Sequence, residues 1–214
     1  MMKYQNLLFD LDGTLTDPGH GIINGLKYSL DKFGITENDS NKLRRFIGPP
    51  LVESFIEFYH FDEEKAKTAV IYYREYYSKR GIYENELYGN MEQLLKQITA
   101  GGRNCLVATS KPQEFAQRVL KHFNIDIYFM DVLGSNFDGT MTDKREIVKT
   151  VITRNNLNKV KTVMIGDRKH DIIGAKANDI DSIAVSWGYG SIDELEEVEP
   201  AYICKNVLDI LDII

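Results

Sequence analysis

Two kinds of hydrophobic pattern alternate along most of this chain. Short unbroken apolar runs are typical of strands that a parallel sheet buries on both faces. Between them, apolar residues recur at intervals of three and four, as on one face of an amphipathic helix. Strands are expected at residues 6–9, 105–109, 129–133, 162–165 and 182–185 and near Tyr202, and helices over 91–98, 113–123, 144–152, 172–177 and 208–214. The alternation predicts an α/β fold with a doubly wound parallel sheet.

The segment from residue 18 to 83 breaks this alternation, because its pattern predicts helix after helix and no strand. Helices are expected from Ile22 to Phe33, from an N-cap at Ser40 to Phe46, from Leu51 to Tyr59, and from an N-cap at Asp62 to about Gly81, the last with Ala66, Ala69, Tyr73 and Tyr76 on one face. We therefore predict a core formed by residues 1–17 and 84–214, into which residues 18–83 are inserted as a helical bundle.

The composition is that of an ordinary globular protein, with 43% hydrophobic and 27% charged residues among 214. A net charge of −6 disfavours nucleic acid as a partner, since phosphate backbones attract basic surfaces. Cys105 and Cys204 are too few for a disulfide framework, no apolar run approaches the length of a membrane span, and no signal peptide opens the chain. We expect a soluble cytoplasmic protein, a monomer or homodimer, whose partner is a small molecule and neither nucleic acid nor membrane.

Polar residues with complementary chemistry follow the strands of the predicted sheet. They are Asp10 and Asp12 after the first strand, Thr109, Ser110 and Lys111 after the next, Lys144 at a helix start, and Asp167 with Asp171 one helical turn beyond. Trp187 and Tyr189 also follow a strand, and they are expected only to pack near the rim of the site. In an open parallel sheet, ligands bind beyond the carboxyl ends of the strands. Carboxylates, hydroxyls and ammonium groups at one edge suit magnesium-assisted phosphoryl transfer, because they offer oxygen ligands to a hard cation and donors to phosphate oxygens.

Asp10 and Asp12 are two residues apart, so in an extended strand their side chains project to the same side. Gly13 permits a sharp turn there and a close approach of the backbone to a phosphate. One carboxylate can attack phosphorus while the other handles the proton of the leaving group or of the attacking water. An Asp-x-Asp-Gly tetrapeptide is by itself also common in ordinary acidic turns. The polar residues at the other strand ends favour the catalytic interpretation.

Together these residues resemble the four motifs of the haloacid dehalogenase-like superfamily. The first motif is similar to Asp10-Leu11-Asp12-Gly13-Thr14-Leu15 with Asp17, the second to Ala108-Thr109-Ser110-Lys111-Pro112, the third to Lys144, and the fourth to Gly166-Asp167-Arg168-Lys169-His170-Asp171. Order and spacing agree over essentially the whole chain, although Ser110 stands where asparagine is commoner. The resemblance implies a Rossmann-like core with a helical cap domain inserted between the first and second motifs.

The resemblance also implies a role for each matching residue. Asp10 is expected to be the nucleophile that becomes an aspartyl phosphate, and Asp12 the general acid and base. The phosphoryl group is expected to be bound by Thr109, Lys144, Ser110 and Gly13, and Mg²⁺ by Asp10, Asp12 through its backbone carbonyl, Asp167 and Asp171. The implied function is a magnesium-dependent phosphatase of small phosphorylated metabolites.

Within the insertion, Arg44-Arg45-Phe46-Ile47-Gly48-Pro49-Pro50-Leu51 is similar to the corresponding stretch of phosphoglycolate phosphatase-like enzymes. Arg45, Gly48 and Pro49 are therefore candidate substrate contacts, with Arg45 able to bind a carboxylate or a second phosphate bidentately. The alternative for Arg44 and Arg45 is a solvated helix end. Nucleoside monophosphates are alternative substrates, because enzymes with this segment act on several phosphomonoesters.

Three other functions are alternatives to a phosphatase. A phosphosugar mutase shares the fold and the aspartyl phosphate, but His20-Gly21-Ile22 lacks a basic residue early in the insertion. A metal-independent dehalogenase does not keep the second aspartate that Asp12 supplies. A receiver-type signalling module also combines acids, a hydroxyl, a lysine and magnesium, yet it is shorter and lacks the Asp-x-Asp pair. A receiver would scarcely release phosphate, so a turnover assay separates it from an enzyme.

Overall fold

The structure is a computed structural model that describes residues 3–214, and these form two compact units. The α/β unit holds the residues up to Thr16 together with Leu87–Ile214, and the helical unit holds Asp17–Glu86. The chain divides after residues 16 and 86, whereas the sequence suggested 17 and 83. Two short strands, β2 (Thr16–Asp17) and β3 (Glu86–Leu87), pair at these two crossing points.

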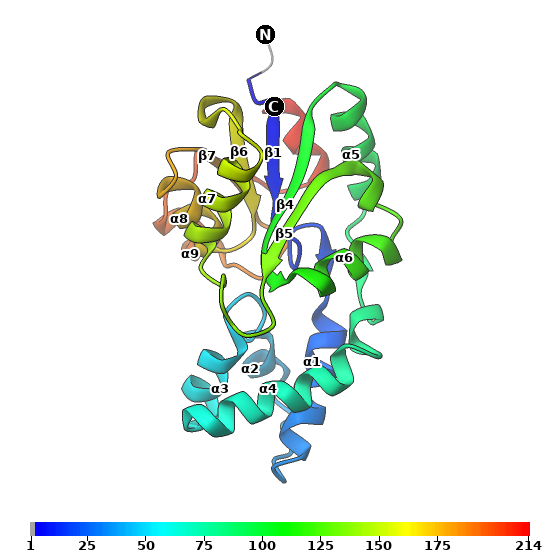
Figure 1. Ribbon diagram of the computed structural model, residues 1–214, viewed down its shortest axis with the longest axis vertical. Helices are drawn as coiled ribbons and strands as arrows, with labels where there is room; N and C mark the ends of the chain where they lie inside the picture. The colour runs from blue at the N-terminus through cyan, green and yellow to red at the C-terminus, as the bar shows by residue number, and fades with distance from the viewer. Residues whose placement is uncertain (1–2) are drawn as a thin grey trace. The chain divides into compact units, whose positions relative to one another are not determined.

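The α/β unit is built on a six-stranded parallel sheet with the order β5-β4-β1-β6-β7-β8 (Figure 1). Its strands are β1 (Asn6–Phe9), β4 (Asn104–Pro112), β5 (Phe129–Ser135), β6 (Thr162–Gly166), β7 (Asp181–Val185) and β8 (Tyr202–Cys204). From β1 the sheet grows outward through β4 to β5, and the chain then returns to β6 on the other side of β1. This reversal confirms the predicted doubly wound fold and leaves β1 at the centre.

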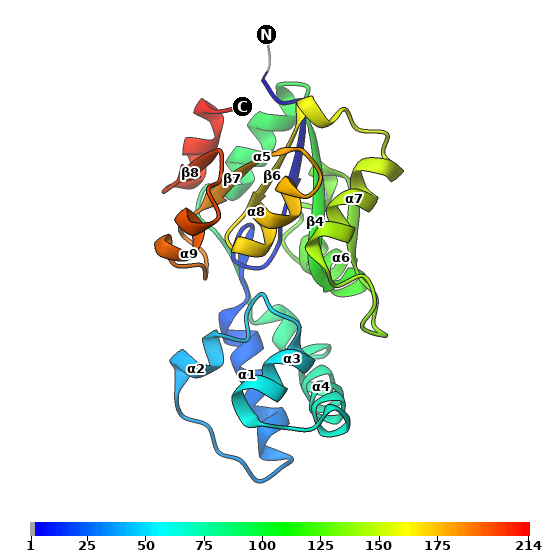
Figure 2. The ribbon, with the colours of Figure 1, turned by 90° about the vertical axis from the view of Figure 1, so that its left-hand side faces the viewer.

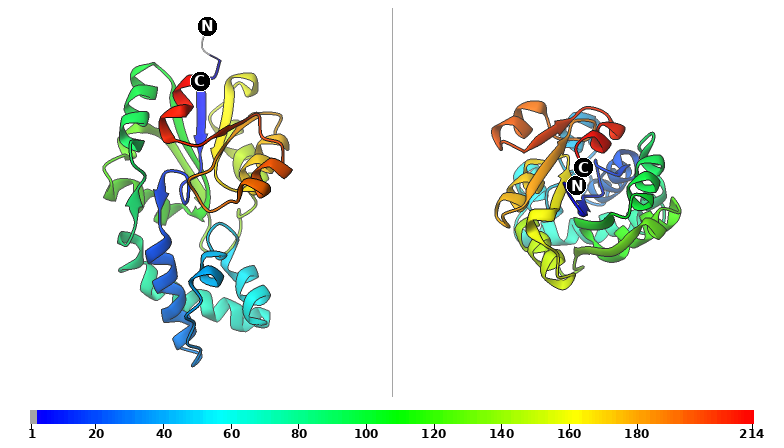
Figure 3. Two further views of the ribbon diagram at one scale, coloured as in Figure 1. Left: turned by 180° about the vertical axis from the view of Figure 1, so that it is seen from behind. Right: turned by 90° about the horizontal axis from the view of Figure 1, so that it is seen from above.

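Helices cover both faces of this sheet. On one face lie α5 (Met91–Ala100) and α6 (Gln113–His122), and on the other lie α7 (Lys144–Arg154), α8 (Lys169–Lys176) and α9 (Ile192–Glu197) (Figures 1 and 2). The C-terminal segment Val207–Asp212 packs beside α5 (Figure 3) as a 3₁₀ helix, in place of the helix expected over 208–214.

The central strands are continuously apolar because both of their faces are covered. Leu8 of β1, Leu106 of β4 and Met164 of β6 are fully buried in one cluster with the α7 side chains. The α7 residues in that cluster are Ile147, Val148, Val151 and Ile152. Packing of this face fixes α7 across the sheet, so that Lys144 at its first turn comes to the carboxyl edge of the strands.

The helical unit contains four α-helices among the described residues. They are α1 (Gly19–Asp31), α2 (Ser40–Arg44), α3 (Leu51–Tyr59) and α4 (Glu63–Tyr77), followed by a 3₁₀ turn at Gly81–Tyr83. The Ser29 hydroxyl of α1 donates to the Ala69 carbonyl of α4 at 2.7 Å. Phe55 contacts Phe46 and Phe61 with ring centroids 5.1 and 5.9 Å apart, which makes an aromatic core.

Two local predictions in this unit were wrong. Asp39, not Ser40, caps α2, because its carboxylate accepts the N–H groups of Asn41 and Lys42 at 2.9 and 3.1 Å. The buried face of α4 carries Tyr77 in place of Tyr76, with the Tyr77 ring stacked on that of Tyr73. Each residue of an α-helix is rotated by slightly less than a third of a full turn from the one before it. Two adjacent tyrosines therefore point in different directions, and only one of them faces inward.

Tyr76 instead helps to hold together the two ends of the helical unit. Its hydroxyl donates to the Glu84 carboxylate at 2.7 Å, and the Asn24 amide donates to the other oxygen at 2.9 Å. The Gly21 N–H donates to the Glu84 carbonyl at 2.9 Å. The segment that leaves the unit is therefore fixed to the helix that enters it.

Gly21→Ala should destabilise the protein, although alanine is normally the better helix residue by up to about 1 kcal/mol. A Cβ atom at Gly21 would lie 1.9 Å from the Gly81 carbonyl oxygen, a backbone atom that cannot rotate away. We expect overpacking to lower the free energy of unfolding by about 1–3 kcal/mol in urea denaturation. Gly89→Ala is the control, because a Cβ there meets nothing within 4 Å, and it should be neutral or slightly stabilising. Equal stability of the two variants would contradict the close approach.

Candidate active site

The candidate site lies where three central strands end. Asp10 directly follows β1, Thr109 lies near the end of β4, and Asp167 directly follows β6. The Asp10 N–H donates to the Ile165 carbonyl at 2.9 Å, which continues the pairing of β1 with β6 up to the site. Because the three strands are parallel neighbours, the topology brings these residues to one edge of the sheet.

A buried lysine connects two of the acids. The Lys144 Nζ lies 3.0 Å from Asp10 Oδ1 and 2.8 Å from Asp171 Oδ1, and it donates to the Ala108 carbonyl at 2.9 Å. Burial alone would lower the pKa of Lys144, but the two carboxylates hold that pKa above its usual value. Lys144 therefore stays cationic and neutralises part of the charge of the acids.

One lysine does not neutralise all the carboxylates at this edge. Burial, followed by the nearby charges of Asp171 and Asp10, raises the pKa of Asp167 to about 8. Burial also raises the pKa of Asp171, although Lys144 acts against this shift. Oxygen atoms of Asp10, Asp167 and Asp171 all lie within 4.8 Å of one another. Such a set of crowded carboxylates fits a hard divalent cation, which would supply the missing positive charge.

Asp167 is held in a cradle that the backbone makes possible. It accepts hydrogen bonds from the Thr14 hydroxyl at 3.1 Å and from the Tyr189 N–H at 2.8 Å. A Cβ atom at Gly13 would lie 2.2 Å from Asp167 Oδ2, and one at Gly188 would lie 2.4 Å from the same oxygen. Gly13 also has φ +87°, a conformation that favours glycine. These two glycines let the chain pass close enough to orient the carboxylate.

The contacts of Asp167 include residues to which the sequence pattern gave no specific role. Thr14 was visible within the first motif, but its hydroxyl had no assigned role. Trp187 and Tyr189 were expected only near the rim; the Trp187 indole N–H donates to the Thr14 carbonyl at 3.1 Å. The loop that contains both residues therefore supports the site from the side of β7.

Asp12 is paired with a second lysine that sequence reasoning left without a role. The Lys111 Nζ donates to both oxygens of the Asp12 carboxylate, at 2.8 and 2.7 Å. Burial raises the pKa of Asp12, while Lys111 acts in the opposite direction. The Asp12 side chain thus lies outside the group of three carboxylates formed by Asp10, Asp167 and Asp171.

The two residues expected to bind phosphate from β4 have different surroundings. Thr109 is almost completely buried, and its hydroxyl accepts the Lys111 N–H at 3.3 Å. The Ser110 hydroxyl donates to the Thr142 carbonyl at 2.9 Å, so it fixes the loop that precedes α7. A role in phosphate binding stays a prediction for both.

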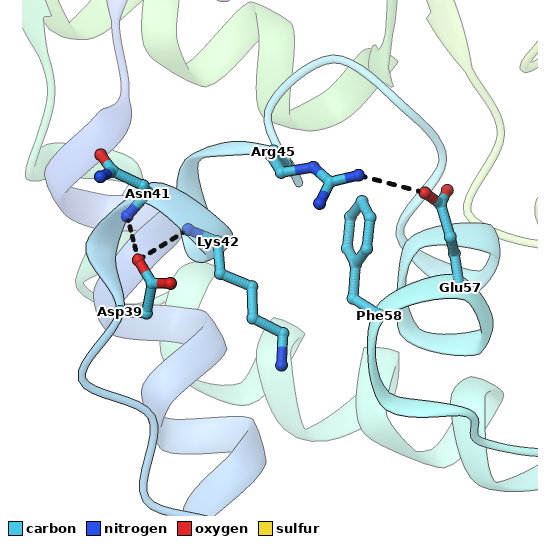
Figure 4. Close-up of a pocket in the computed structure, with 6 residues that line it drawn as sticks. All are labelled: Asp39, Asn41, Lys42, Arg45, Glu57 and Phe58. Atoms are coloured by element: carbon cyan, nitrogen blue, oxygen red, sulfur yellow. Dashed lines mark hydrogen bonds and ion pairs between the residues drawn. The ribbon is translucent and has the colours of Figure 1, made fainter.

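The candidate substrate residues lie in the helical unit. Arg45 lines a hollow of about 470 Å³ together with Asp39, Asn41, Lys42, Glu57 and Phe58 (Figure 4). Its guanidinium lies 3.3 Å from Glu57 and 4.2 Å from the centre of the Phe58 ring. Gly48, with φ +107°, and Pro49 form the turn that connects α2 to α3. Contact of these residues with a substrate stays a prediction.

Comparison with known proteins gives one consistent family. A sequence model described as haloacid dehalogenase-like hydrolase matches residues 7–185. The chain is 42% identical over 206 residues to a 5'-nucleotidase of Pseudomonas aeruginosa, covering 96% of this chain and 93% of that protein. It is 34% identical over 193 residues to tyrosine-protein kinase PtkA of Mycobacterium tuberculosis, covering 90% of this chain and 66% of that protein. It is 29% identical over 215 residues to a phosphoglycolate phosphatase of Colwellia psychrerythraea, covering 94% of each.

Solved structures agree with this result. A predicted phosphatase from Clostridium acetobutylicum is 42% identical with a TM-score of 0.94, over 98% of this chain and 97% of that one. A putative phosphatase from Clostridium difficile is 52% identical with a TM-score of 0.89, over 98% of each chain. Within the described residues, no helix has both the length and the apolar character needed to cross a bilayer.

Gly13→Ala should disturb Asp167 and weaken divalent-cation binding. The added Cβ would occupy the space of the Asp167 carboxylate, so we expect the Mg²⁺ dissociation constant measured by calorimetry to rise about 10- to 100-fold. Gly139→Ala is a matched control, because Gly139 has φ +88° but a Cβ there meets nothing within 4 Å. Both variants suffer the same backbone strain, so equal Mg²⁺ affinity would show that the cradle is not needed.

The raised pKa of Asp167 predicts a pH-dependent stability of the metal-free protein. With a folded pKa of about 8 against an ordinary 3.8, the folded state keeps a proton that the unfolded state loses. Stability in a chelator should therefore fall as pH rises from about 4 to 8, by at most about 1.4 kcal/mol per pH unit for one proton. Saturating Mg²⁺ should reduce this fall, because the cation binds the ionised form.

Thermal unfolding at pH 5, 6.5 and 8, with chelator or with Mg²⁺, measures this effect. Mg²⁺ should raise the melting temperature least at pH 5, where protons compete with the cation. Asp167→Asn is the control, and it should lose both the pH dependence and most of the stabilisation by Mg²⁺. A Mg²⁺ effect that is equal at every pH and unchanged in Asp167→Asn would place the cation elsewhere.

Proposed function

Because this chain belongs to the haloacid dehalogenase-like hydrolase family and is a phosphatase, we propose that it hydrolyses small phosphomonoesters with Mg²⁺, through a phosphoenzyme on Asp10. The observation that carries this proposal is the arrangement of Asp10 with Asp167, Asp171 and the buried Lys144 at the carboxyl edge of the sheet. It combines a nucleophilic oxygen with a fixed cation and with oxygen ligands for a metal ion.

The reaction has two steps in this proposal. A carboxylate oxygen of Asp10 bonds to phosphorus while the bond from phosphorus to the ester oxygen breaks, and Asp12 gives its proton to the departing oxygen. Water then attacks the phosphorus of the aspartyl phosphate and gives a proton to Asp12, so phosphate leaves and Asp10 is restored. Asp12 thus acts first as an acid and then as a base, so a single residue carries the proton in both steps.

The other site residues stabilise charge in both steps. Lys144 and Thr109 are proposed to hold the phosphoryl oxygens, with Ser110 and the backbone at Gly13 beside them. Lys144 is already cationic and is held by Asp10, so it needs little rearrangement to meet an anion at that carboxylate.

The proposed metal ligands are the carboxylates of Asp10, Asp167 and Asp171 and the backbone carbonyl of Asp12. The short distances among the three carboxylates and the raised pKa of Asp167 support their role as ligands. When bound, Mg²⁺ supplies positive charge to the phosphoryl oxygens. The carboxylates position it, and Thr14 and Tyr189 keep Asp167 oriented toward that task.

Two substrate classes follow from the relatives. The 42% identical relative is named 5'-nucleotidase, whereas the phosphoglycolate phosphatase is 29% identical. We therefore propose nucleoside 5'-monophosphates as the first substrates to test. Phosphoglycolate remains the second class, as the segment around Arg45 suggests. Every phosphomonoester offers the same phosphoryl group, so discrimination requires contacts to the leaving group. We propose that Arg45, Gly48 and Pro49 contribute to them.

A phosphate-release assay tests the proposal. Its substrates are nucleoside 5'-monophosphates, phosphoglycolate, sugar phosphates and p-nitrophenyl phosphate, each with Mg²⁺ and again after chelation. We expect release that depends on the cation, since crowded carboxylates repel a dianionic substrate. Full activity after exhaustive chelation would overturn the metal assignment. Transfer of phosphate to another position of a sugar, without release, would make the protein a mutase.

Asp10→Asn should abolish turnover, because an amide cannot attack phosphorus to form the phosphoenzyme. Asp12→Asn should slow the proton transfers, which typically costs about 10²- to 10⁴-fold. Steady-state hydrolysis of the best substrate measures both changes. Asp179→Asn, at an acid whose side chain is 84% exposed, is the control and should keep the wild-type rate. An Asp10→Asn enzyme with a near wild-type rate would disprove the nucleophile assignment.

A further inference from the structure

Lys111 is a second buried lysine of the α/β unit, and it contacts Asp12. Its Nζ donates to Oδ1 and Oδ2 of Asp12 at 2.8 and 2.7 Å, and the two side chains are only 5% and 16% exposed. Lys144 forms ion pairs with Asp10 and Asp171, so the two lysines contact different carboxylates. A single ammonium in contact with both oxygens restricts where the carboxylate can lie and stabilises its charge.

The backbone around Lys111 is built to place this side chain. Strand β4 continues beyond Thr109, but its pairing with β5 shifts between Ala108 and Pro112. Ala108 pairs with Leu133 and Pro112 pairs with Ser135, so β4 advances four residues while β5 advances two. The Ser135 hydroxyl of β5 donates to the Ser110 carbonyl at 2.8 Å. A bulge of this kind redirects side chains next to an active site, and here it is held in place from the neighbouring strand.

Gly134 contributes to the same anchoring. A Cβ atom there would lie 2.4 Å from the Lys111 carbonyl oxygen, so only glycine lets β5 approach the bulge this closely. The Lys111 N–H also lies against the Thr109 hydroxyl at 3.3 Å. The main chain of Lys111 is therefore fixed on both sides, which restricts where its ammonium can lie.

We propose that Lys111 is a positioning residue for Asp12, which it orients for proton transfer to the leaving-group oxygen. This inference rests on the proposed function of Asp12 as general acid and base. A lone aspartate can rotate about two side-chain bonds, whereas a buried ammonium bonded to both oxygens restricts where the carboxylate can lie. The ammonium also stabilises the carboxylate that forms when the proton leaves for the ester oxygen, whose bond to phosphorus is breaking. Misplacing a catalytic group by about 1 Å can cost 10²-fold in rate.

The test compares two leaving groups in a single turnover. p-Nitrophenolate is a weak base that departs without a proton, whereas an alkoxide needs one. The alkyl substrate is the alkyl phosphomonoester that the wild type hydrolyses fastest. With this substrate, Lys111→Met should slow formation of the Asp10 phosphoenzyme by about 10- to 100-fold. With p-nitrophenyl phosphate the rate of this step should stay within about threefold. Rapid quench with excess enzyme measures the first step alone.

Three variants distinguish positioning from other effects. Lys111→Arg keeps a cation with paired donors, and it should recover part of the rate on the alkyl substrate. Lys149→Met changes an exposed lysine on α7 and should leave both rates unaltered. The double variant Lys111→Met with Asp12→Asn should be no slower than Asp12→Asn alone, because Lys111 acts through Asp12. It also avoids leaving a buried carboxylate without its cation, so it controls for misfolding.

The outcomes separate this inference from the proposed function. If the wild type forms no phosphoenzyme, the proposed function fails and Lys111 has no task of this kind. If the wild type forms it, and Lys111→Met slows both leaving groups equally or neither, the positioning role is wrong. Additive losses in the double variant would overturn it too, since Lys111 would then act on the substrate directly.

Discussion

The structure depends on the repulsion among carboxylates that meet at the carboxyl edge of β1 and β6. Asp10, Asp167 and Asp171 share a small buried volume, and Lys144 is the cation that contacts two of them. Burial makes each uncompensated charge costly, which is why the pKa of Asp167 rises to about 8. A fold tolerates such a cluster only if the surrounding apolar core is stable enough to impose it. Here the fully buried central strands and the α7 face supply that support.

Close backbone packing converts this repulsion into a defined geometry. Gly13 and Gly188 let two loops reach Asp167 from opposite ends of the sequence, and Thr14 and Tyr189 then hold its carboxylate. A similar close approach occurs between β4 and β5, where Gly134 lets β5 pack closely against the bulge that contains Lys111. In both places a missing side chain lets the backbone approach closely, and a polar group there hydrogen-bonds an aspartate of the candidate site. Backbone contacts as well as ion pairs therefore hold these side chains in place.

The proposed function gives the two units different roles. In the proposed reaction, residues of the α/β unit bind the phosphoryl group, which is common to all phosphomonoesters. The helical unit has its own aromatic core, and its entering and leaving segments are tied together through Glu84. Arg45 already has Glu57 as an exposed partner. An anionic leaving group would have to compete with that pair, and an exposed pair of this kind is weak enough to exchange.

The sequence by itself determined the fold class, the helical insertion and the acids at the strand ends, because these depend on local periodicity and on the topology of a parallel sheet. It also indicated Lys144 at a helix start. It could not determine that Lys111 binds Asp12 or that Tyr189 holds Asp167, since such contacts depend on loop paths and on a bulge between two strands. The N-cap at Asp39 and the inward face of Tyr77 were missed by one residue each. Only the tertiary structure decides these cases, because a shift of one residue changes a side chain's direction while leaving the hydrophobic pattern almost unchanged.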